Sequence, residues 1–372
     1  MIFRSTSRRP IVIVGNGVRE AGAAGILREF YKKTRIPVLT TMNAVDLAQD
    51  KDKLGFIGVY GHRVANMIVA NSDLVISVGA RLGLRQIGNK KEYFAPDAFL
   101  IRADVDQYEL SRYIKPDEEK HLVDAKEFLC GLYDEDIPAY DEWNKACFEA
   151  RDVLEPYDKD LGNHCVEKIS SMLPENPIVA IDIGQVQCWA AQSLTLKGDK
   201  GRILIGGSYG SMGCGLPYAI GACFANNKES VFCISGDGGM QMNIQELQTI
   251  VSNKLPVKVF VVNNKALGKI TEIQASACDG RYSITTEASG YSVPEFSKVA
   301  NAYGLRAVTI EGYESLDEYI DWITDDEPCL INILLPDAVK LQPKMNWNEK
   351  EMRPGLEESV VSRVNRILRE VG

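Results

Sequence analysis

Apolar runs alternate with amphipathic stretches along the chain, most clearly between residues 230 and 264. Residues 230–234 form an apolar run that leads into a cluster of glycines. An amphipathic stretch with helical spacing covers residues 244–258, and residues 259–264 form a second apolar run. This order predicts a strand, a glycine-rich turn, a helix and a strand, which together make one βαβ unit.

The same alternation extends over most of the chain. Residues 11–15, 73–79, 98–104 and 178–184 are predominantly apolar, as is typical of strands buried on both faces. The pattern therefore predicts an α/β protein with two doubly wound parallel-sheet domains. The expected divisions are a central Rossmann-like domain (1–131), a connector (132–163), a second domain (164–336) and a C-terminal tail (337–372) with a closing amphipathic helix.

The composition of the chain argues against several classes of function. The chain has 372 residues and a formal net charge of −9, and it has no basic block, so a nucleic-acid partner is not expected. Nine scattered cysteines without a CxxC pair, and three histidines, favour reduced thiols in the cytoplasm and argue against a zinc site. The N-terminal apolar run is too short for a signal peptide or a membrane span.

The turn after residue 234 carries the main chemical signal. Gly236, Gly238 and Gly239 allow backbone N–H groups to approach an anion at the start of a helix. Asp237 adds a carboxylate, and Asn264 ends the next strand with an amide oxygen. Such oxygens suit magnesium held together with a diphosphate. The simpler alternative is a tight turn with a capping Asp and asparagines that only end a strand.

Asp237 and Asn264 lie 27 positions apart, and Asn263-Asn264 closes a strand. This arrangement resembles the signature of thiamine-diphosphate-dependent enzymes. The flanking segments 241–247 and 255–259 (Gln-Met-Asn-Ile-Gln-Glu-Leu and Leu-Pro-Val-Lys-Val) resemble the large catalytic subunit of acetolactate synthase. The resemblance spans nearly the whole chain, but only the later two of that family's three domains.

The resemblance implies a flavin site in the first domain. Gly15-Asn16-Gly17 starts like a dinucleotide fingerprint but lacks its third glycine, so by itself it is a weak signal. In the family, the middle domain holds FAD, and some relatives keep this fold without flavin. The matching positions are Gly15, Gly17, Thr40, Tyr60, Gly61, His62, Gly79, Arg81, Arg85, Asp104 and Val105. His62 as a turn residue and Arg85 as a solvated charge are the plain alternatives.

In the second domain, the resemblance implies a set of thiamine diphosphate contacts. Gln185 and Gln187 fall in a turn where the family has Gly-Gln-His-Gln, with Val186 in place of the histidine. Met212 matches the bulky residue that holds the cofactor bent, although a methionine here could also be simple core. The magnesium ligands would be Asp237, Asn264 and the carbonyl of Ala266. The remaining matched cofactor positions are Gly210, Ser211, Gly236, Gly238, Gly239, Leu267 and Gly268.

Two positions depart from the family where it shapes the pocket for a second 2-keto acid. Lys269 stands where a methionine is usual, and Ile273 where a tryptophan is usual. Lys269 would either place a cation beside the reacting carbon or point to solvent. The acceptor substrate therefore stays open, and a 2-keto acid decarboxylase or a sugar-acceptor carboligase is the alternative within this class.

The family's first domain, which binds the pyrimidine ring and supplies the activating glutamate, has no counterpart here. We expect either a separate chain that supplies it or a truncated product, and a homo-oligomer. The predicted function is thiamine-diphosphate- and magnesium-dependent decarboxylation of pyruvate or a related 2-keto acid, with carboligation to a second carbonyl compound. A non-catalytic subunit that binds FAD or ADP is the alternative from another class.

Overall fold

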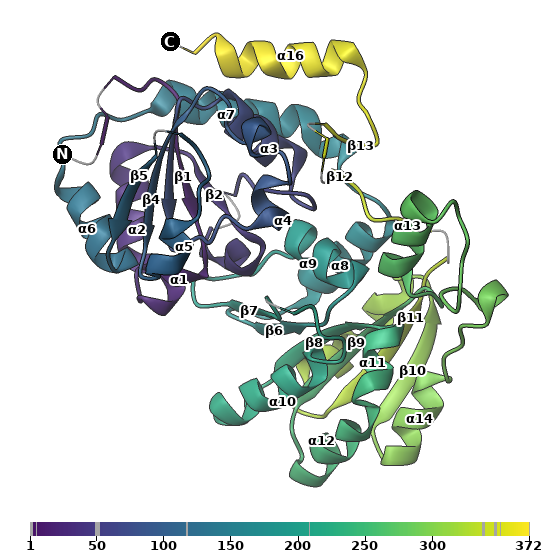
Figure 1. The fold of residues 1–372 in the computed structure, drawn as a ribbon. Helices are drawn as coiled ribbons and strands as arrows, with labels where there is room; N and C mark the ends of the chain where they lie inside the picture. Colours follow the sequence, from purple (N-terminus) through teal and green to yellow (C-terminus); the bar gives the residue numbers. More distant parts are fainter. Residues whose placement is uncertain are drawn as a thin grey trace. The chain divides into compact units, whose positions relative to one another are not determined.

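The computed structural model describes residues 3–4, 6–48, 53–116, 118–207, 209–336, 339–345, 348–349 and 351–371. The chain forms two compact units, Met1–Lys159 with Gln342–Gly372, and Asp160–Leu341 (Figure 1). Each unit is built on a parallel sheet flanked by helices, which confirms the predicted α/β class. Among the helices described, none combines the length and the apolar character needed to cross a membrane.

The first unit has a five-stranded parallel sheet in the order β2-β1-β3-β4-β5. Its strands are β1 (Pro10–Val14), β2 (Val38–Thr40), β3 (Leu74–Val78), β4 (Phe99–Asp104) and β5 (Glu119–Leu122). Its helices are α1 (Asn16–Glu20), α2 (Ala24–Thr34), α3 (Arg63–Asn71), α4 (Leu84–Ile87), α5 (Gln107–Ser111), α6 (Ala125–Asp134), α7 (Asp141–Leu154) and α16 (Glu358–Arg369). A short hairpin, β12 (Lys344–Met345) and β13 (Met352–Arg353), precedes α16.

Successive side chains of β1 belong to two different hydrophobic clusters of the first unit. Ile11 and Ile13 belong to a cluster that also contains Trp143 of α7 and Leu368 of α16. Val12 and Val14 belong to a second cluster, which includes residues of α2 and α6. Because successive strand side chains point to opposite faces, an apolar run buries both faces of the sheet. The residues expected in a connector, up to Lys159, thus lie in the first unit, as does the C-terminal helix.

The second unit has a six-stranded parallel sheet in the order β10-β11-β9-β8-β6-β7. Its strands are β6 (Ile178–Ile181), β7 (Arg202–Ile205), β8 (Val231–Gly236), β9 (Val257–Asn263), β10 (Arg306–Glu311) and β11 (Cys329–Leu334). Its helices are α8 (Leu161–Met172), α9 (Gln185–Ser193), α10 (Gly215–Ala225), α11 (Asp237–Met242), α12 (Leu247–Asn253), α13 (Gly268–Ala277), α14 (Phe296–Tyr303) and α15 (Ile320–Thr324).

Strand order creates a switch point in each sheet. In the second unit the chain runs from β6 to β7 on one side and then to β8 on the other. In the first unit β1 has β2 on one side and β3 on the other. Ligands of open α/β sheets bind at the carboxyl ends of strands, at such switch points. The turns after β6 and β8, and after β1 and β3, are therefore the places where a cofactor is expected.

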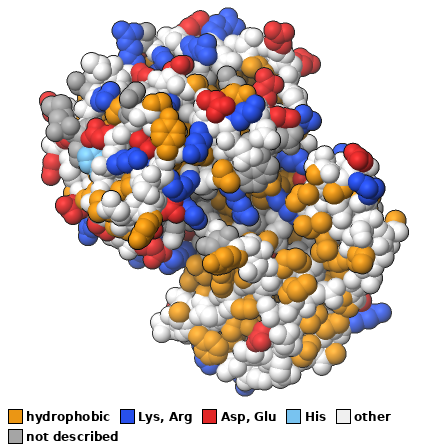
Figure 2. Space-filling view, viewed as in Figure 1, with side chains coloured by type: hydrophobic (Ala, Val, Ile, Leu, Met, Phe, Trp, Pro, Cys, Tyr) orange, Lys and Arg blue, Asp and Glu red, His pale blue; other side chains and the backbone are white. Residues whose placement is uncertain are grey.

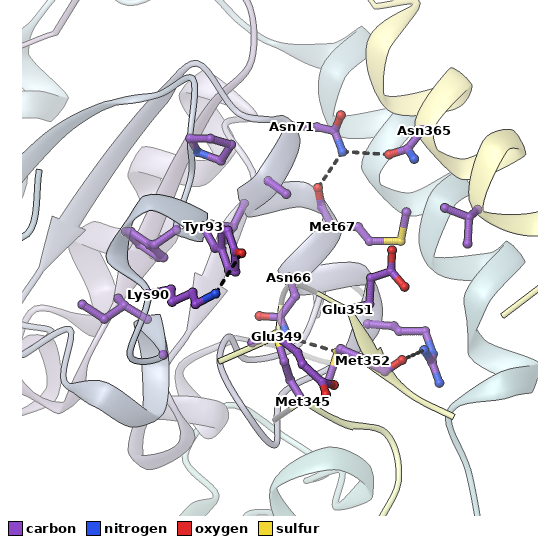
Figure 3. A pocket seen from close by; sticks show the side chains of 18 of the residues that line it. Asn66, Met67, Asn71, Lys90, Tyr93, Met345, Glu349, Glu351, Met352 and Asn365 are labelled. Carbon is purple, nitrogen blue, oxygen red and sulfur yellow. Dashed lines mark hydrogen bonds between the residues drawn. The ribbon is translucent and has the colours of Figure 1, made fainter. Parts of the chain in front are cut away.

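A cavity of about 340 Å³ lies in the first unit, beside α3, the β12–β13 hairpin and α16 (Figure 3). Apolar side chains such as Met67 and Met352 line it, and Asn71 and Asn365 hydrogen-bond to each other at its edge. This cavity contains none of the residues that the sequence assigned to FAD.

Candidate cofactor and metal site

The candidate metal ligands lie at the carboxyl ends of two neighbouring strands. Gly236, the last residue of β8, stands beside Val262 of β9 in the register of the sheet. Asp237 therefore follows β8 at the same edge at which Asn264 follows β9. The register therefore places the two residues at the ends of neighbouring strands.

Asp237 is the first residue of α11 and only 3% exposed. Its Oδ1 accepts hydrogen bonds from the backbone N–H of Gly238 at 2.6 Å and from the hydroxyl of Tyr291 at 3.2 Å. Its Oδ2 accepts from the N–H of Ala266 at 3.2 Å. Burial raises the pKa of Asp237 to about 6, although these donors favour the ionised form. A cation bound at this carboxylate would stabilise its ionised form, which burial disfavours.

Asn264 is 6% exposed, and its Nδ2 donates to Oε1 of Gln185 at 3.0 Å. An amide nitrogen only donates hydrogen bonds, so the side-chain oxygen is the atom with which Asn264 can bind a cation. Ala266 is tied to Asp237 through its own N–H. The structure thus brings together all three residues predicted to hold the metal.

The two glutamines occupy the expected turn, but their amide donors are used within the protein. Gln185 Nε2 donates to Oε1 of Glu272 at 2.8 Å and to the carbonyl of Val339 at 3.2 Å. Gln187 Nε2 donates to the carbonyl of Gly206 at 3.1 Å. A Cβ at Gly268 would lie 1.9 Å from Oε1 of Gln185, so a side chain there would displace the end of the Gln185 side chain. Both amides therefore hold neighbouring segments in this structure.

Gly238 lets apolar side chains pack directly against the turn beside Asp237. A Cβ on Gly238 would lie 2.6 Å from Cδ2 of Leu267 and 3.1 Å from Cε of Met212. Met212, 38% exposed, thus places its methyl group next to the turn. It follows Gly210, which has a φ of +68°, and the exposed Ser211. Gly236 has no atoms near its missing side chain, so it stays open to a ligand.

Sequence reasoning missed Asp182, which is 1% exposed at the end of β6. Its carboxylate accepts from the N–H of Ile183 at 2.6 Å and of Gly213 at 2.9 Å, and from the Ser235 hydroxyl at 3.0 Å. Burial raises the pKa of Asp182. A carboxylate directly after a buried strand, at a switch point, was the available signal. Tyr291, which contacts Asp237, carries no comparable signal because it lies in an irregular segment.

Lys269, at the start of α13, is half-buried, and its Nζ lies 3.4 Å from Sγ of Cys188 on α9. Its ammonium group is therefore directed at the neighbouring helix and away from bulk solvent. Ile273, one turn further along α13, is 49% exposed. The two positions that depart from the resembled family thus lie on the helix that follows Ala266.

In the first unit, three predicted glycines meet at the switch point between β1 and β3. A Cβ on Gly15 would lie 2.1 Å from the carbonyl oxygen of Gly79, and one on Gly17 would lie 2.7 Å from the Cα of Gly79. Asp104 ends β4 at the same edge of the sheet and accepts from the N–H of Asp106 at 3.0 Å. The glycines thus let the turns after β1 and β3 pack directly on each other, at the strand ends where open α/β sheets bind nucleotides.

Of the other predicted flavin positions, some make contacts within the protein and others are exposed. Arg81 pairs with Glu109 at 2.7 Å, and Arg85 is exposed. His62 Nδ1 accepts from the N–H of Phe56 at 3.2 Å, and its ring packs edge-on against the Phe56 ring. This is the plain turn role that the sequence left open for His62. Thr40 is buried at the end of β2, Gly61 is buried, Tyr60 is half-buried and Val105 is exposed.

The donor set around Asp237 fits a magnesium ion that is held jointly with a diphosphate. One carboxylate, one amide oxygen and a backbone carbonyl are hard oxygen ligands, and magnesium commonly takes the rest from phosphate and water. No group of three His, Cys, Asp or Glu side chains that could hold a metal occurs in the described ranges. The protein alone would therefore leave coordination positions for the diphosphate.

Each of the two units matches a model of a known protein family. Residues 182–333 match the family model described as "Thiamine pyrophosphate enzyme, C-terminal TPP binding domain". Residues 5–132 match the model described as "Thiamine pyrophosphate enzyme, central domain". Asp237, Asn264 and Ala266 fall in the first of these matches, and Gly15, Gly17 and Gly79 in the second.

Curated relatives resemble most of the chain. The acetolactate synthase isozyme 2 large subunit of Escherichia coli (strain K12) is 32% identical over 348 residues, which cover 91% of this chain and 62% of the relative. The acetolactate synthase large subunit of Lactococcus lactis subsp. lactis (strain IL1403) is 30% identical over 349 residues, 91% of this chain and 60% of the relative. The chain thus spans about three fifths of these relatives' length.

Proposed function

Because the chain belongs to the thiamine pyrophosphate enzymes, of which it carries the central domain and the C-terminal TPP binding domain, we propose that its second unit binds thiamine diphosphate and Mg²⁺. The metal would lie at Asp237, with Asn264 and the carbonyl of Ala266 as further ligands. The observation that carries this proposal is the buried Asp237 carboxylate, joined to the Ala266 backbone and next to the strand that ends just before Asn264.

The chain's own residues would bind and orient the cofactor. The backbone N–H group of Gly239, at the start of α11, would face the diphosphate, whereas that of Gly238 already donates to Oδ1 of Asp237 at 2.6 Å. Met212 and Leu267 would form an apolar wall beside it, because both lie against Gly238. When bound, thiamine diphosphate supplies carbanion chemistry at 2-keto acids, and the protein supplies orientation and a dry pocket.

The relatives named as acetolactate synthases support a reaction of that type: decarboxylation of pyruvate or a related 2-keto acid, followed by carboligation to a second carbonyl compound. A role in branched-chain amino acid synthesis in the cytoplasm would follow. Lys269 and the exposed Ile273 favour a second candidate, a decarboxylase or a carboligase with a different acceptor. Product analysis with pyruvate alone, and with pyruvate plus candidate aldehydes, separates the two.

We also propose a partner chain that supplies the pyrimidine-binding domain, in addition to self-association. Apolar side chains are spread over the face of the second unit seen in Figure 2. Several exposed ones follow the strands that end at the site: Tyr209, Met242, Ile270 and Ile273. Exposed apolar surface of this kind marks sites of protein association. The chain alone should then bind the cofactor weakly and show little turnover.

FAD in the first unit is a separate part of the proposal. The place of Gly15, Gly17 and Gly79 at the switch point between β1 and β3 supports it, with Asp104 at the neighbouring strand end. A yellow sample whose flavin is released on denaturation would bear this out. A colourless sample that gains no flavin on incubation with FAD would leave the first unit with a structural role.

The decisive test is calorimetric titration of thiamine diphosphate and Mg²⁺ into the full chain and into Asp237→Ala. We expect binding by the wild type and none by D237A, because the variant lacks the only carboxylate of the proposed ligand set. Asp326→Ala is the matched control, since Asp326 is exposed at the amino end of β11, on the opposite edge of the sheet. Equal binding by D237A, or unchanged activity in a reconstituted complex, would favour a non-catalytic subunit.

A further inference from the structure

A short segment late in the second unit, residues 339–341, is tied down by three hydrogen bonds. The carbonyl of Val339 accepts from Gln185 at 3.2 Å. The N–H of Lys340 donates to Asp160 at 3.2 Å, and the N–H of Leu341 donates to Oε1 of Glu272 at 2.8 Å. Val339 and Leu341 are also buried, at 6% and 1% exposure. The segment therefore lies fixed against α13 and α9.

Glu272 joins this segment to the turn after β6. Its Oε1 accepts from the Leu341 backbone and from Nε2 of Gln185, both at 2.8 Å. A carboxylate has only acceptors, so both neighbours must present N–H groups to it. Glu272 thereby fixes which end of the Gln185 amide faces α13.

The other end of Gln185 reaches the proposed metal ligand. Because Nε2 is held by Glu272 and Val339, Oε1 faces Asn264 and accepts from its Nδ2 at 3.0 Å. That bond in turn leaves the oxygen of Asn264 for a cation. Glycine at position 268 leaves room for this amide, because a Cβ there would lie 1.9 Å from Oε1 of Gln185. Gln185, Glu272 and Val339, from distant parts of the chain, thus set the orientation of one ligand.

We propose that Glu272 is a positioning residue for the metal site, which acts through Gln185 on Asn264 and couples the segment 339–341 to metal binding. This inference rests on the proposed function, in which Asn264 holds Mg²⁺. Groups that orient a metal ligand commonly change metal affinity by about 10- to 100-fold when they are removed. Ordering of the segment and occupation of the metal site should therefore favour each other.

The test measures Mg²⁺ affinity by calorimetry on the full chain, in the presence of thiamine diphosphate. Glu272→Ala should raise the Mg²⁺ dissociation constant about 10-fold. Glu272→Gln keeps the shape and one acceptor oxygen, so it should recover part of the affinity at an unchanged melting temperature. Glu318→Ala is the matched control, because Glu318 is an exposed glutamate of the same unit.

Amide hydrogen exchange at Leu341 gives a readout that needs no activity. In the wild type, Mg²⁺ with thiamine diphosphate should slow exchange of this N–H, and in E272A the exchange should be fast with or without them. Failure of the wild type to bind Mg²⁺ and thiamine diphosphate would overturn the proposed function itself. Wild-type binding with the same Mg²⁺ affinity in E272A would overturn the positioning role alone.

Discussion

Asp158 and Arg63 form a buried pair in the first unit. Oδ2 of Asp158 accepts from the Arg63 backbone N–H at 3.2 Å, and Oδ1 accepts from Nε at 2.8 Å. The carboxylate is 9% exposed, and burial raises the pKa of Asp158 to about 6, against the lowering effect of Arg63. The group therefore titrates in the fold at a higher pH than in the unfolded chain.

This shift predicts a pH dependence of stability with a definite sign. The folded pKa lies above the ordinary value of 3.8, so the folded protein binds the proton more tightly. The stabilisation by this proton is complete below the unfolded pKa and is lost as pH rises through the folded one. Relative to Asp158→Asn, the wild type should lose about 2 kcal/mol of unfolding free energy between about pH 4 and pH 7.

Hydrogen exchange of the buried β1 and β3 amides measures this difference within the first unit. Asp152→Asn serves as the control, because its ion pair with Arg151 is largely exposed, at 65% for the Asp152 side chain. Parallel pH profiles for the wild type and D158N would contradict the shift.

At the scale of elements, strands were predictable and helix breaks were not. The apolar run 11–15 became β1 (Pro10–Val14), and the run 259–264 lies within one residue of the end of β9 (Val257–Asn263). The amphipathic stretch 244–258 is not one helix, since α12 ends at Asn253 and Lys254 adopts φ +50°. Left-handed turns at non-glycine residues depend on tertiary packing and leave little trace in the pattern of apolar positions.

Within the candidate site, the sequence predicts the positions of the residues that directly follow strands. Asp237 and Asn264 follow neighbouring strands, so a βαβ reading brings them together. The orientation of Gln185 was not predictable, because its partners Glu272 and Val339 lie 87 and 154 positions away. Lys269 likewise finds Cys188, 81 positions away. Such pairings follow from the fold and not from local sequence.

The close packing of Gly15 on Gly79, in the turn after β1, can be tested by substitution. In Gly15→Ala the new Cβ would lie 2.1 Å from the carbonyl of Gly79, and backbone atoms cannot rotate away as a side chain would. We expect a loss of about 3 kcal/mol in the stability of the first unit. Gly25→Ala is the matched control, since Gly25 lies in α2 with nothing near the added atom, and it should be neutral or slightly stabilising. Thermal unfolding compares them, and equal melting temperatures would refute the predicted clash.

On the scale of the whole molecule, the first unit is discontinuous in sequence. The chain leaves it at Lys159 and returns at Gln342. The returning segment contributes two fully buried residues, Val364 and Leu368, to the core shared with α3 and α7. It also supplies the carbonyls of Met352 and Pro354, which accept from Arg63 at 3.2 and 2.7 Å.

A chain that ends at Leu341 should therefore lose stability in one unit only. It keeps every hydrogen bond of residues 339–341, but it exposes the face under α16 and leaves Arg63 with fewer acceptors. Burial of two aliphatic side chains is worth about 3–6 kcal/mol, so the α3 and α7 amides should exchange much faster. Those of β8 and β9 should keep the wild-type rate, because none of their sheet partners is removed. Equal acceleration in both units would mean that they unfold together, and the division of the chain into two independent cores would be wrong.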